Sequence, residues 1–308
     1  MTESSTPTTL PINTKHVKQQ FSRRKDLSEA QFLYGEVARR MDERLRLVRL
    51  QPSRMLDAGC GAGQQFDLLH QRYPESIYIG QDINPDLLRA AKKHVQAQLP
   101  GSMRQWLNRI SGKASPVEWL EKDLAHTGLA PESLQLVWSN LALHWHPAPH
   151  DVLAEWGRVL SLNGLVFFSC FGPATMQELR LALTQAGLQT VTPSFVDMHD
   201  FGDLLIEKGF ADPVMDQEIL TLTYSAPEKL LEDVRALGGN PALGRRAGLA
   251  GRQWRQRLLQ ALESQRKADG KIHLTIEVAY GHAWRTGTVR TAPGETRISV
   301  SAIQRKGA

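Results

Sequence analysis

The most informative stretch of the chain is Leu56-Asp57-Ala58-Gly59-Cys60-Gly61-Ala62-Gly63. It closes a predicted strand at 54–58 and opens a predicted helix at 62–73. Glycine has no Cβ, so three glycines within five residues let the backbone turn tightly and pass close to a ligand. A dinucleotide-binding turn would have a further glycine three positions after Gly61, where this chain has Gln64. The sequence therefore predicts a ligand-binding turn without the dinucleotide spacing.

Two acidic residues stand at predicted strand ends near this turn. Asp57 precedes the glycines and suits a ligand with a positive centre or an amino group better than a pyrophosphate. Asp82 follows a second predicted strand at 76–80, 19 residues beyond Gly63, where its carboxylate can accept both hydroxyls of a ribose. The structural alternatives are a turn or cap role for Asp57 and a cap for the helix at Pro85 for Asp82. We favour the ligand role for both.

Short apolar runs alternate with helical segments over the following residues. Further strands are predicted at 117–120, 134–139, 165–170, 213–224 and 273–280, and further helices from Pro85 and at 149–160, 174–186, 196–208, 227–237 and 252–267. This alternation implies right-handed βαβ units and a parallel sheet that is covered on both faces. The predicted fold class is α/β, with a doubly wound, mostly parallel sheet, an N-terminal helix and a helical cap.

The chain divides into four predicted regions. They are a disordered lead at 1–20, an N-terminal basic helix at 21–50, a ligand-binding core at 51–171, and cap helices with the remaining strands at 172–308. Residues 94–116 are longer and more basic than a helix-to-strand connection needs, so we expect a surface insertion with a short amphipathic helix there.

Composition excludes several classes of protein. With 41% hydrophobic and 22% charged residues among 308, the chain is not wholly disordered. It has no apolar run of membrane-spanning length and no apolar N-terminal signal. Two cysteines cannot make a disulfide framework, so we expect a reducing, cytoplasmic setting, with Cys60 and Cys170 as small buried groups.

The glycine-rich segment resembles the first motif of class I S-adenosylmethionine-dependent methyltransferases, whose sheet is Rossmann-like with seven strands. Asp82 matches their ribose-binding acid, Lys122-Asp123-Leu124 the segment beside the adenine, and residues 139–145 their fourth motif. The resemblance implies S-adenosylmethionine as cofactor. Its binding residues would be Asp57, Gly59, Gly61, Gly63, Asp82, Ile83, Asp123, Leu124 and Asn140.

Two narrower families remain open. Ser139-Asn140-Leu141-Ala142-Leu143-His144-Trp145, together with residues 171–180, 200–205 and 209–210, resembles the malonyl-carrier-protein O-methyltransferase of early biotin synthesis. That family methylates the free carboxyl of a malonyl thioester, which hides its charge from fatty-acid synthesis. The basic segment at 21–50 and residues 276–284 equally resemble methyltransferase-like assembly factors of respiratory complex I, which hydroxylate an arginine. A module that binds the donor without catalysis is a third possibility.

The methylation reaction makes few demands on side chains. A malonyl carboxylate is already ionised near pH 7, so its methylation needs no general base. Catalysis would rest on alignment, which can contribute roughly 7–11 kcal/mol. Arg180 is the candidate to hold the carboxylate. The alternatives are a surface helix arginine or an ion pair with Glu178 or Asp203. We expect His144 to line the mouth of the site, and Trp145 to pack against the donor or in the core.

An acyl carrier protein is the expected partner. Such carriers are acidic, and the basic residues that would receive one are Arg39, Arg40, Arg44, Arg245, Arg246 and Arg252. The histidines at 144, 146 and 150 lack the ligand spacing of a metal site, so no metal is expected. The charge pattern shows no nucleic-acid-binding module, and we expect a monomer.

Overall fold

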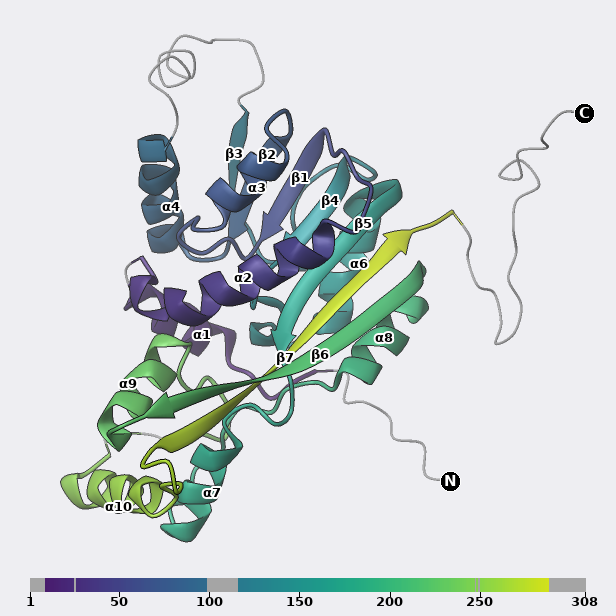
Figure 1. Ribbon diagram of the computed structural model, residues 1–308. Coiled ribbons are helices and arrows are strands. Elements are labelled where there is room, and N and C mark those ends of the chain that lie inside the picture. The colour runs from purple at the N-terminus through teal and green to yellow at the C-terminus, as the bar shows by residue number, and fades with distance from the viewer. Residues whose placement is uncertain (1–8, 25, 99–115, 247, 249, 288–308) are drawn as a thin grey trace, which may run out of the picture.

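The computed structural model describes residues 9–24, 26–98, 116–246, 248 and 250–287 (Figure 1). Its strands form one sheet in the order β3-β2-β1-β4-β5-β7-β6. The strands are β1 (Arg54–Ala58), β2 (Ile77–Asp82), β3 (Val117–Glu121), β4 (Leu134–Ser139), β5 (Leu160–Phe171), β6 (Phe210–Tyr224) and β7 (Ile272–Arg285). Strands β1 to β5 are parallel, and β7 is antiparallel to β5 and β6. The predicted doubly wound, mostly parallel sheet of seven strands is confirmed.

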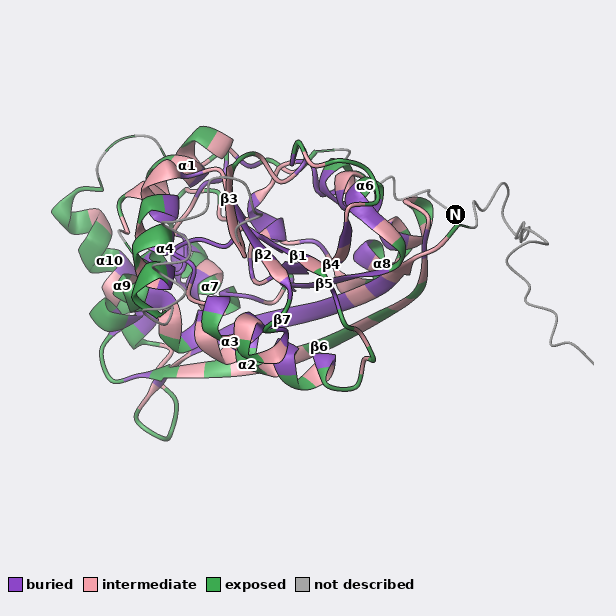
Figure 2. Cartoon of the chain, turned by 90° about the horizontal axis from the view of Figure 1, so that it is seen from above, coloured by how far each residue is buried: buried purple, intermediate pink, exposed green. Residues whose placement is uncertain are grey.

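Helices cover both faces of this sheet. They are α1 (Thr14–Ser22), α2 (Gln31–Leu45), α3 (Phe66–Arg72), α4 (Pro85–Gln98), α6 (Pro149–Val159), α7 (Gln177–Gln185), α8 (Met198–Glu207), α9 (Pro227–Ala236) and α10 (Arg252–Glu263), with single turns η1 (Ser28–Ala30) and η2 (Leu143–Trp145). Side chains alternate between the faces of a strand. In β4, Leu136 and Trp138 therefore join the apolar cluster beneath α2 and α3, while Val137 joins the cluster beneath α6 and α8. Figure 2 shows these buried strands between helices whose outer faces are exposed.

The two last strands extend beyond the parallel part of the sheet. Strand β5 ends at Phe171, which pairs with Val278. The residues of β7 before Val278 pair only with β6, so a two-stranded ribbon projects past the carboxyl ends of the parallel strands. Helices α7, α9 and α10 gather around this ribbon (Figure 1). They form the predicted helical cap, next to the edge where the ligand-binding turn lies.

The N-terminal region differs from the sequence-based expectation. Residues 14–20, predicted to belong to a disordered lead, form most of helix α1. The Asn13 side chain caps this helix by accepting a hydrogen bond from the backbone N–H of His16 at 3.1 Å, and Val17 is buried. The predicted basic helix at 21–50 is instead the end of α1, a turn, η1 and α2. The expected amphipathic helix within 94–116 falls mostly outside the described residues.

Candidate active site

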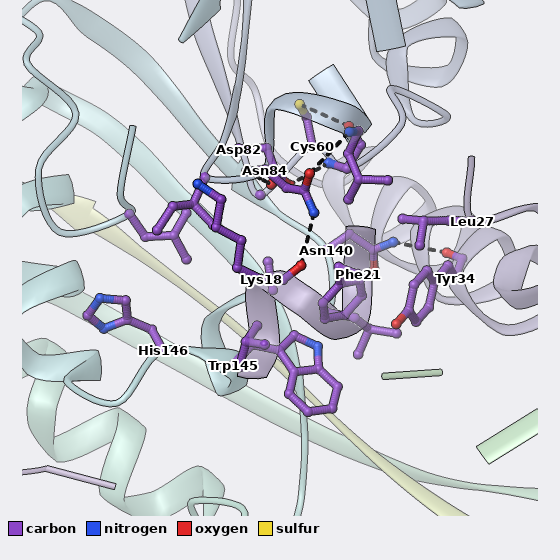
Figure 3. A pocket seen from close by; sticks show the side chains of 18 of the residues that line it. Lys18, Phe21, Leu27, Tyr34, Cys60, Asp82, Asn84, Asn140, Trp145 and His146 are labelled. Carbon is purple, nitrogen blue, oxygen red and sulfur yellow. Dashed lines mark hydrogen bonds between the residues drawn. The ribbon is translucent and has the colours of Figure 1, made fainter. Parts of the chain in front are cut away.

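A cavity opens at the carboxyl edge of the sheet, where the loops after β1, β2, β3 and β4 meet under helices α1 and α2 (Figure 3). In a doubly wound sheet this edge is where ligands bind, because the connections after β1 and β4 run to opposite sides. The loops contribute Gly59, Cys60, Gly61, Asp82, Ile83, Asn84, Asp123, Leu124, Asn140, Leu141, Ala142, Trp145 and His146, and the helices add Thr14, Val17, Lys18, Phe21, Gln31 and Tyr34. We call this the donor cavity.

The Asp82 carboxylate connects two of these loops. Its Oδ2 accepts a hydrogen bond from the N–H of Gly61 at 3.0 Å, and its Oδ1 accepts one from the N–H of Asn84 at 2.8 Å. Burial raises the pKa of Asp82 to about 6, against the opposing effect of these backbone N–H groups. Each carboxylate oxygen keeps a second lone pair. Asp82 can thus accept hydroxyl hydrogen bonds in the cavity. The next helix is capped by Asn84 rather than by Asp82, because the Asn84 side chain accepts from the N–H groups of Asp86 at 3.0 Å and Leu87 at 3.4 Å.

The three glycines of the turn have different structural roles. Gly59 has φ +79°, and a Cβ there would lie 2.3 Å from the Cβ of Ala142. A Cβ on Gly61 would lie 2.8 Å from a methyl group of Leu27. Gly63 does not line the donor cavity: a Cβ there would meet Ala91 of α4 at 3.0 Å. The first two glycines bring the backbone to the cavity, while the third lets the turn pack closely against α4.

Asp57 also lies outside the lining of the donor cavity. The hydroxyl of Tyr78 donates a hydrogen bond to its Oδ2 at 2.6 Å. Burial raises the pKa of Asp57 to about 7, with a further increase from the negative charge of Asp82. The carboxyl group thus stands beneath the glycine turn, bonded to a neighbouring strand.

The loops after β3 and β4 are tied together by His146. Its Nδ1 accepts a hydrogen bond from the N–H of Ala148 at 3.0 Å, so Nε2 carries the proton that points at Oδ1 of Asp123, 3.0 Å away. This hydrogen bond holds the pKa of Asp123 below its usual range. Leu124 and Ile83 line the cavity beside it. Sequence reasoning did not select His146, because the partner that orients it is distant in the chain.

Asn140 links helix α2, which covers the donor cavity, to the sheet. Its Nδ2 donates to the carbonyl oxygen of Tyr34 in α2 at 2.9 Å, and its Oδ1 accepts from the hydroxyl of Ser169 at 3.0 Å. Helix α1, which also covers the donor cavity, is held in a similar way, because the Asn84 amide donates to the carbonyl oxygen of Lys18 at 3.2 Å (Figure 3). The contributions of α1 and α2 to the cavity were not foreseen from the sequence.

Aromatic rings form one wall of the donor cavity. Trp145 lines it and meets Phe21, Phe171 and Phe195 edge to face, with ring centres 5.7, 6.5 and 6.4 Å away. His144 lies behind Trp145 rather than at the mouth of the site, with its ring centre 4.6 Å from that of Trp145. Burial lowers the pKa of His144 to about 3, so its imidazole is neutral. His144 is part of the core, where its ring packs against Trp145, Phe171 and Phe195.

Arg180 lines a second cavity, of about 450 Å³, between α7, α9 and α10. Its guanidinium nitrogens donate to the carbonyl oxygens of Thr175 at 2.5 Å and Pro173 at 2.7 Å. The expected alternative partner, Glu178, instead accepts hydrogen bonds from Thr275. Within the described ranges Arg180 has no ion pair, and burial lowers its pKa.

Arg24 is a further cationic residue of interest that sequence reasoning missed. Its Nε donates to the carbonyl oxygen of Arg235 at 2.6 Å, and its guanidinium lies 5.2 Å from the centre of the Phe21 ring. Its Nη1 is buried and has no hydrogen-bond partner among the described residues. The sequence places Arg24 in a run of basic residues, and nothing local distinguishes it from its neighbours.

The predicted docking arginines separate into two groups. Those of α2 are engaged by acidic groups: Arg39 with Glu36 and Glu43, Arg40 with Glu36 and Glu218, and Arg44 with Asp216. In contrast, Arg246 packs over the ring of Trp254, and it has no ion pair with a described residue. Arg40 and Arg44 thus link α2 to β6, whereas no described acidic group neutralises Arg246 near α10.

Three further observations concern the described residues alone. Both cysteines are free and buried. No group of three His, Cys, Asp or Glu side chains is arranged to hold a metal ion. None of the described helices is both long enough and apolar enough to cross a membrane.

A seven-stranded sheet in this order, with a glycine turn and an acid at its carboxyl edge, defines the class I S-adenosylmethionine-dependent methyltransferases. Residues 56–168 match the family model for the methyltransferase domain. The YcgJ protein of Bacillus subtilis has the same fold, with a TM-score of 0.55 at 14% identity over 82% of this chain and 99% of that one. Phosphoethanolamine N-methyltransferase 2 of Haemonchus contortus, solved with S-adenosylhomocysteine, gives 0.54 at 13% identity over 88% and 60%.

Curated relatives narrow the class. A malonyl-[acyl-carrier protein] O-methyltransferase of Laribacter hongkongensis is 44% identical over 83% of this chain and 84% of the relative. That of Gallionella capsiferriformans is 40% identical over 94% and 97%. The chain belongs to the malonyl-[acyl-carrier protein] O-methyltransferase family.

Proposed function

We propose that this protein transfers a methyl group from S-adenosylmethionine to the free carboxyl of a malonyl thioester on acyl carrier protein, an early step of biotin synthesis. The observation that carries the proposal is 40% identity to such a methyltransferase across nearly the whole of both chains. The similarity therefore includes the cap and the helices α1 and α2 that cover the donor cavity, as well as the donor-binding core.

The donor cavity fits S-adenosylmethionine in its chemistry. Asp82 offers carboxylate oxygens for ribose hydroxyls, and Ile83 and Leu124 offer apolar surface for an adenine. Gly59 and Gly61 give close backbone approach for the amino-acid end, since a Cβ on either would meet a neighbouring side chain. When bound, the donor supplies an electrophilic methyl group on a sulfonium sulfur. Asp123 and Asn140 line the same cavity, whereas Asp57 and Gly63 support the turn from behind.

The side chains present suit a reaction that needs no base. A carboxylate attacks through an oxygen that is already negative at neutral pH. His144, neutral and buried behind Trp145, does not line the donor cavity and takes no part in proton transfer. The protein's task is to align the carboxylate in a site that excludes water. Trp145 serves that exclusion as part of the aromatic wall.

A cation must hold the substrate carboxylate in line with the donor. We propose Arg180, which lines the second cavity and whose guanidinium carries no ion pair with a described residue. Its carbonyl contacts orient the group without neutralising it. Arg24, beside Phe21 at the aromatic wall, is the rival for this role because its Nη1 lacks a partner among the described residues.

We also propose that the protein acts as a monomer in the cytoplasm. Two free, buried cysteines support a cytoplasmic setting, because disulfides are rare in reducing compartments.

The direct test is transfer of label from S-adenosylmethionine to malonyl carrier protein. A base-labile methyl ester on the malonyl group is expected, and its absence at saturating donor would overturn the proposal. Complementation separates this function from arginine hydroxylation. The gene should restore growth of a biotin auxotroph that lacks its malonyl methyltransferase, whereas restored respiration with no biotin rescue would favour the assembly-factor activity.

A further inference from the structure

The second cavity has a lining that changes from its mouth to its interior. At the mouth are exposed residues, Arg235, Ala250 and Arg255. The interior is walled by Leu179, Leu183, Val234 and Leu258, all of them buried, while Thr190, Thr192 and Asn240, which are partly buried, add polar groups. A cavity with cationic groups at its mouth and apolar walls inside suits an elongated ligand that has an anionic outer end and a less polar inner part.

Aromatic rings and a short stretch of backbone lie between this cavity and the donor cavity. Phe195 lines the second cavity and Trp145 lines the donor cavity, and their rings meet edge to face with centres 6.4 Å apart. The backbone completes the partition: a Cβ on Gly238 would lie 2.2 Å from the Trp145 ring, and the next residue, Gly239, lines the second cavity. The Trp145–Phe195 pair is thus the place where the linings of the two cavities come into contact.

The charge around the mouth matches the same kind of ligand. Arg252 and Arg255 of α10 and Arg246 before it form no ion pair with any described residue, unlike the arginines of α2. Unneutralised arginine is suited to phosphate, which it can bind through two parallel hydrogen bonds.

We propose that the second cavity binds the phosphopantetheine arm that presents the acyl thioester, with its phosphodiester near Arg255 and its thioester end at the Trp145–Phe195 partition. This proposal rests on the proposed function, because a malonyl thioester held in the second cavity must present its free carboxyl to the methyl donor in the donor cavity. From the phosphodiester toward the thioester, the arm carries a gem-dimethyl group and then two amide groups. The phosphodiester suits the cationic mouth, the gem-dimethyl group suits the leucine walls, and the amides suit the polar groups of Thr190, Thr192 and Asn240. Arg180 lines the same cavity and is available to the acyl group there.

The test fills the cavity and compares substrates with and without the arm. Thr192 stands in the segment between α7 and α8 and lines the cavity half-buried, so Thr192→Trp places an indole inside it with little demand on the core. Ser194→Trp is the matched control, since Ser194 is exposed in the same segment and does not line the cavity. The substrates are malonyl carrier protein, malonyl-coenzyme A and the short malonyl-N-acetylcysteamine, and donor affinity is measured with S-adenosylhomocysteine.

For Thr192→Trp we expect KM to rise at least tenfold for both substrates that carry the arm. KM for malonyl-N-acetylcysteamine and the affinity for S-adenosylhomocysteine should change less than twofold, and Ser194→Trp should behave as wild type. If Thr192→Trp does not fold, Thr190→Trp replaces it, because Thr190 lines the same cavity. An unchanged KM for the arm-bearing substrates, or an equal rise for the short one, overturns the proposal. Failure of the wild type to methylate any malonyl thioester overturns the proposed function instead.

Discussion

The hydroxyl of Tyr78 in β2 donates a hydrogen bond of 2.6 Å to Oδ2 of Asp57 in β1, beneath the glycine turn. Both groups are buried, and the pKa of Asp57 is raised to about 7. An acid that the motif assigns to the ligand is therefore paired within the protein. Its distinctive consequence is a dependence of stability on pH.

Asp57→Asn should make the protein less sensitive to rising pH. The folded pKa of about 7 exceeds the unfolded value of about 3.9, so between those values the native state binds the extra proton. Wild-type stability therefore falls as pH rises through this window, by on the order of 3–4 kcal/mol from this group. Asparagine does not titrate and still accepts from Tyr78. Chemical unfolding from pH 4 to pH 8 measures the free energy of unfolding of both proteins. The value for the variant should rise relative to that of the wild type up to about pH 7, whereas a difference that stays constant with pH contradicts the raised pKa of Asp57.

Asp82→Ala should weaken binding of S-adenosylhomocysteine by about 1.5–3 kcal/mol, the usual cost of losing hydrogen bonds to a charged group. Titration calorimetry measures it. Asp86→Ala is the control, since Asp86 lies in the following helix, pairs with Arg89 and does not line the donor cavity. Unchanged affinity of Asp82→Ala with an intact fold would remove Asp82 from the site.

Gly59→Ala should reduce stability and donor binding more than backbone strain alone explains. A left-handed conformation costs a residue with a Cβ roughly 1–2 kcal/mol. Gly248→Ala isolates that cost. Gly248 has φ +86°, and apart from its chain neighbours no described residue lies within 4 Å of its Cβ position, whereas a Cβ on Gly59 would lie 2.3 Å from Ala142. Thermal unfolding and calorimetry should show the larger loss for Gly59→Ala. Equal losses would mean that the close approach to Ala142 relaxes without cost.

Arg180→Ala should separate substrate recognition from donor binding. Loss of the carboxylate's charge partner should lower kcat/KM for the malonyl thioester by about 2 kcal/mol, or roughly thirtyfold, with donor affinity nearly unchanged. Arg180→Lys should recover only part, because a point charge cannot hold two oxygens in a fixed plane.

Arg24→Ala, with the exposed Arg23→Ala as its control, tests the rival for that role. If Arg180 holds the carboxylate, Arg24→Ala should retain most of the activity in the same assay. Full activity of Arg180→Ala together with a large loss in Arg24→Ala would transfer the role to Arg24.

The parts of the fold that local sequence predicts are those that local physical chemistry determines. The glycine turn follows from conformational freedom and spacing, and Asp82 from its place at a strand end, so both were identified before the fold was known. The doubly wound sheet follows from alternating apolar runs and helical segments. A helical cap after the fifth strand was likewise expected, and α7, α9 and α10 form it.

Tertiary structure alone decided which similar residues differ in role. Arg40 and Arg24 look alike in the sequence, yet Glu218 of β6 engages the first while the second keeps a buried nitrogen without a partner among the described residues. His144 and His146 stand two residues apart, but one is buried behind Trp145 and the other bonds Asp123 in the donor cavity. The physical reason is that burial and pairing depend on neighbours brought from distant parts of the chain, which no local pattern contains.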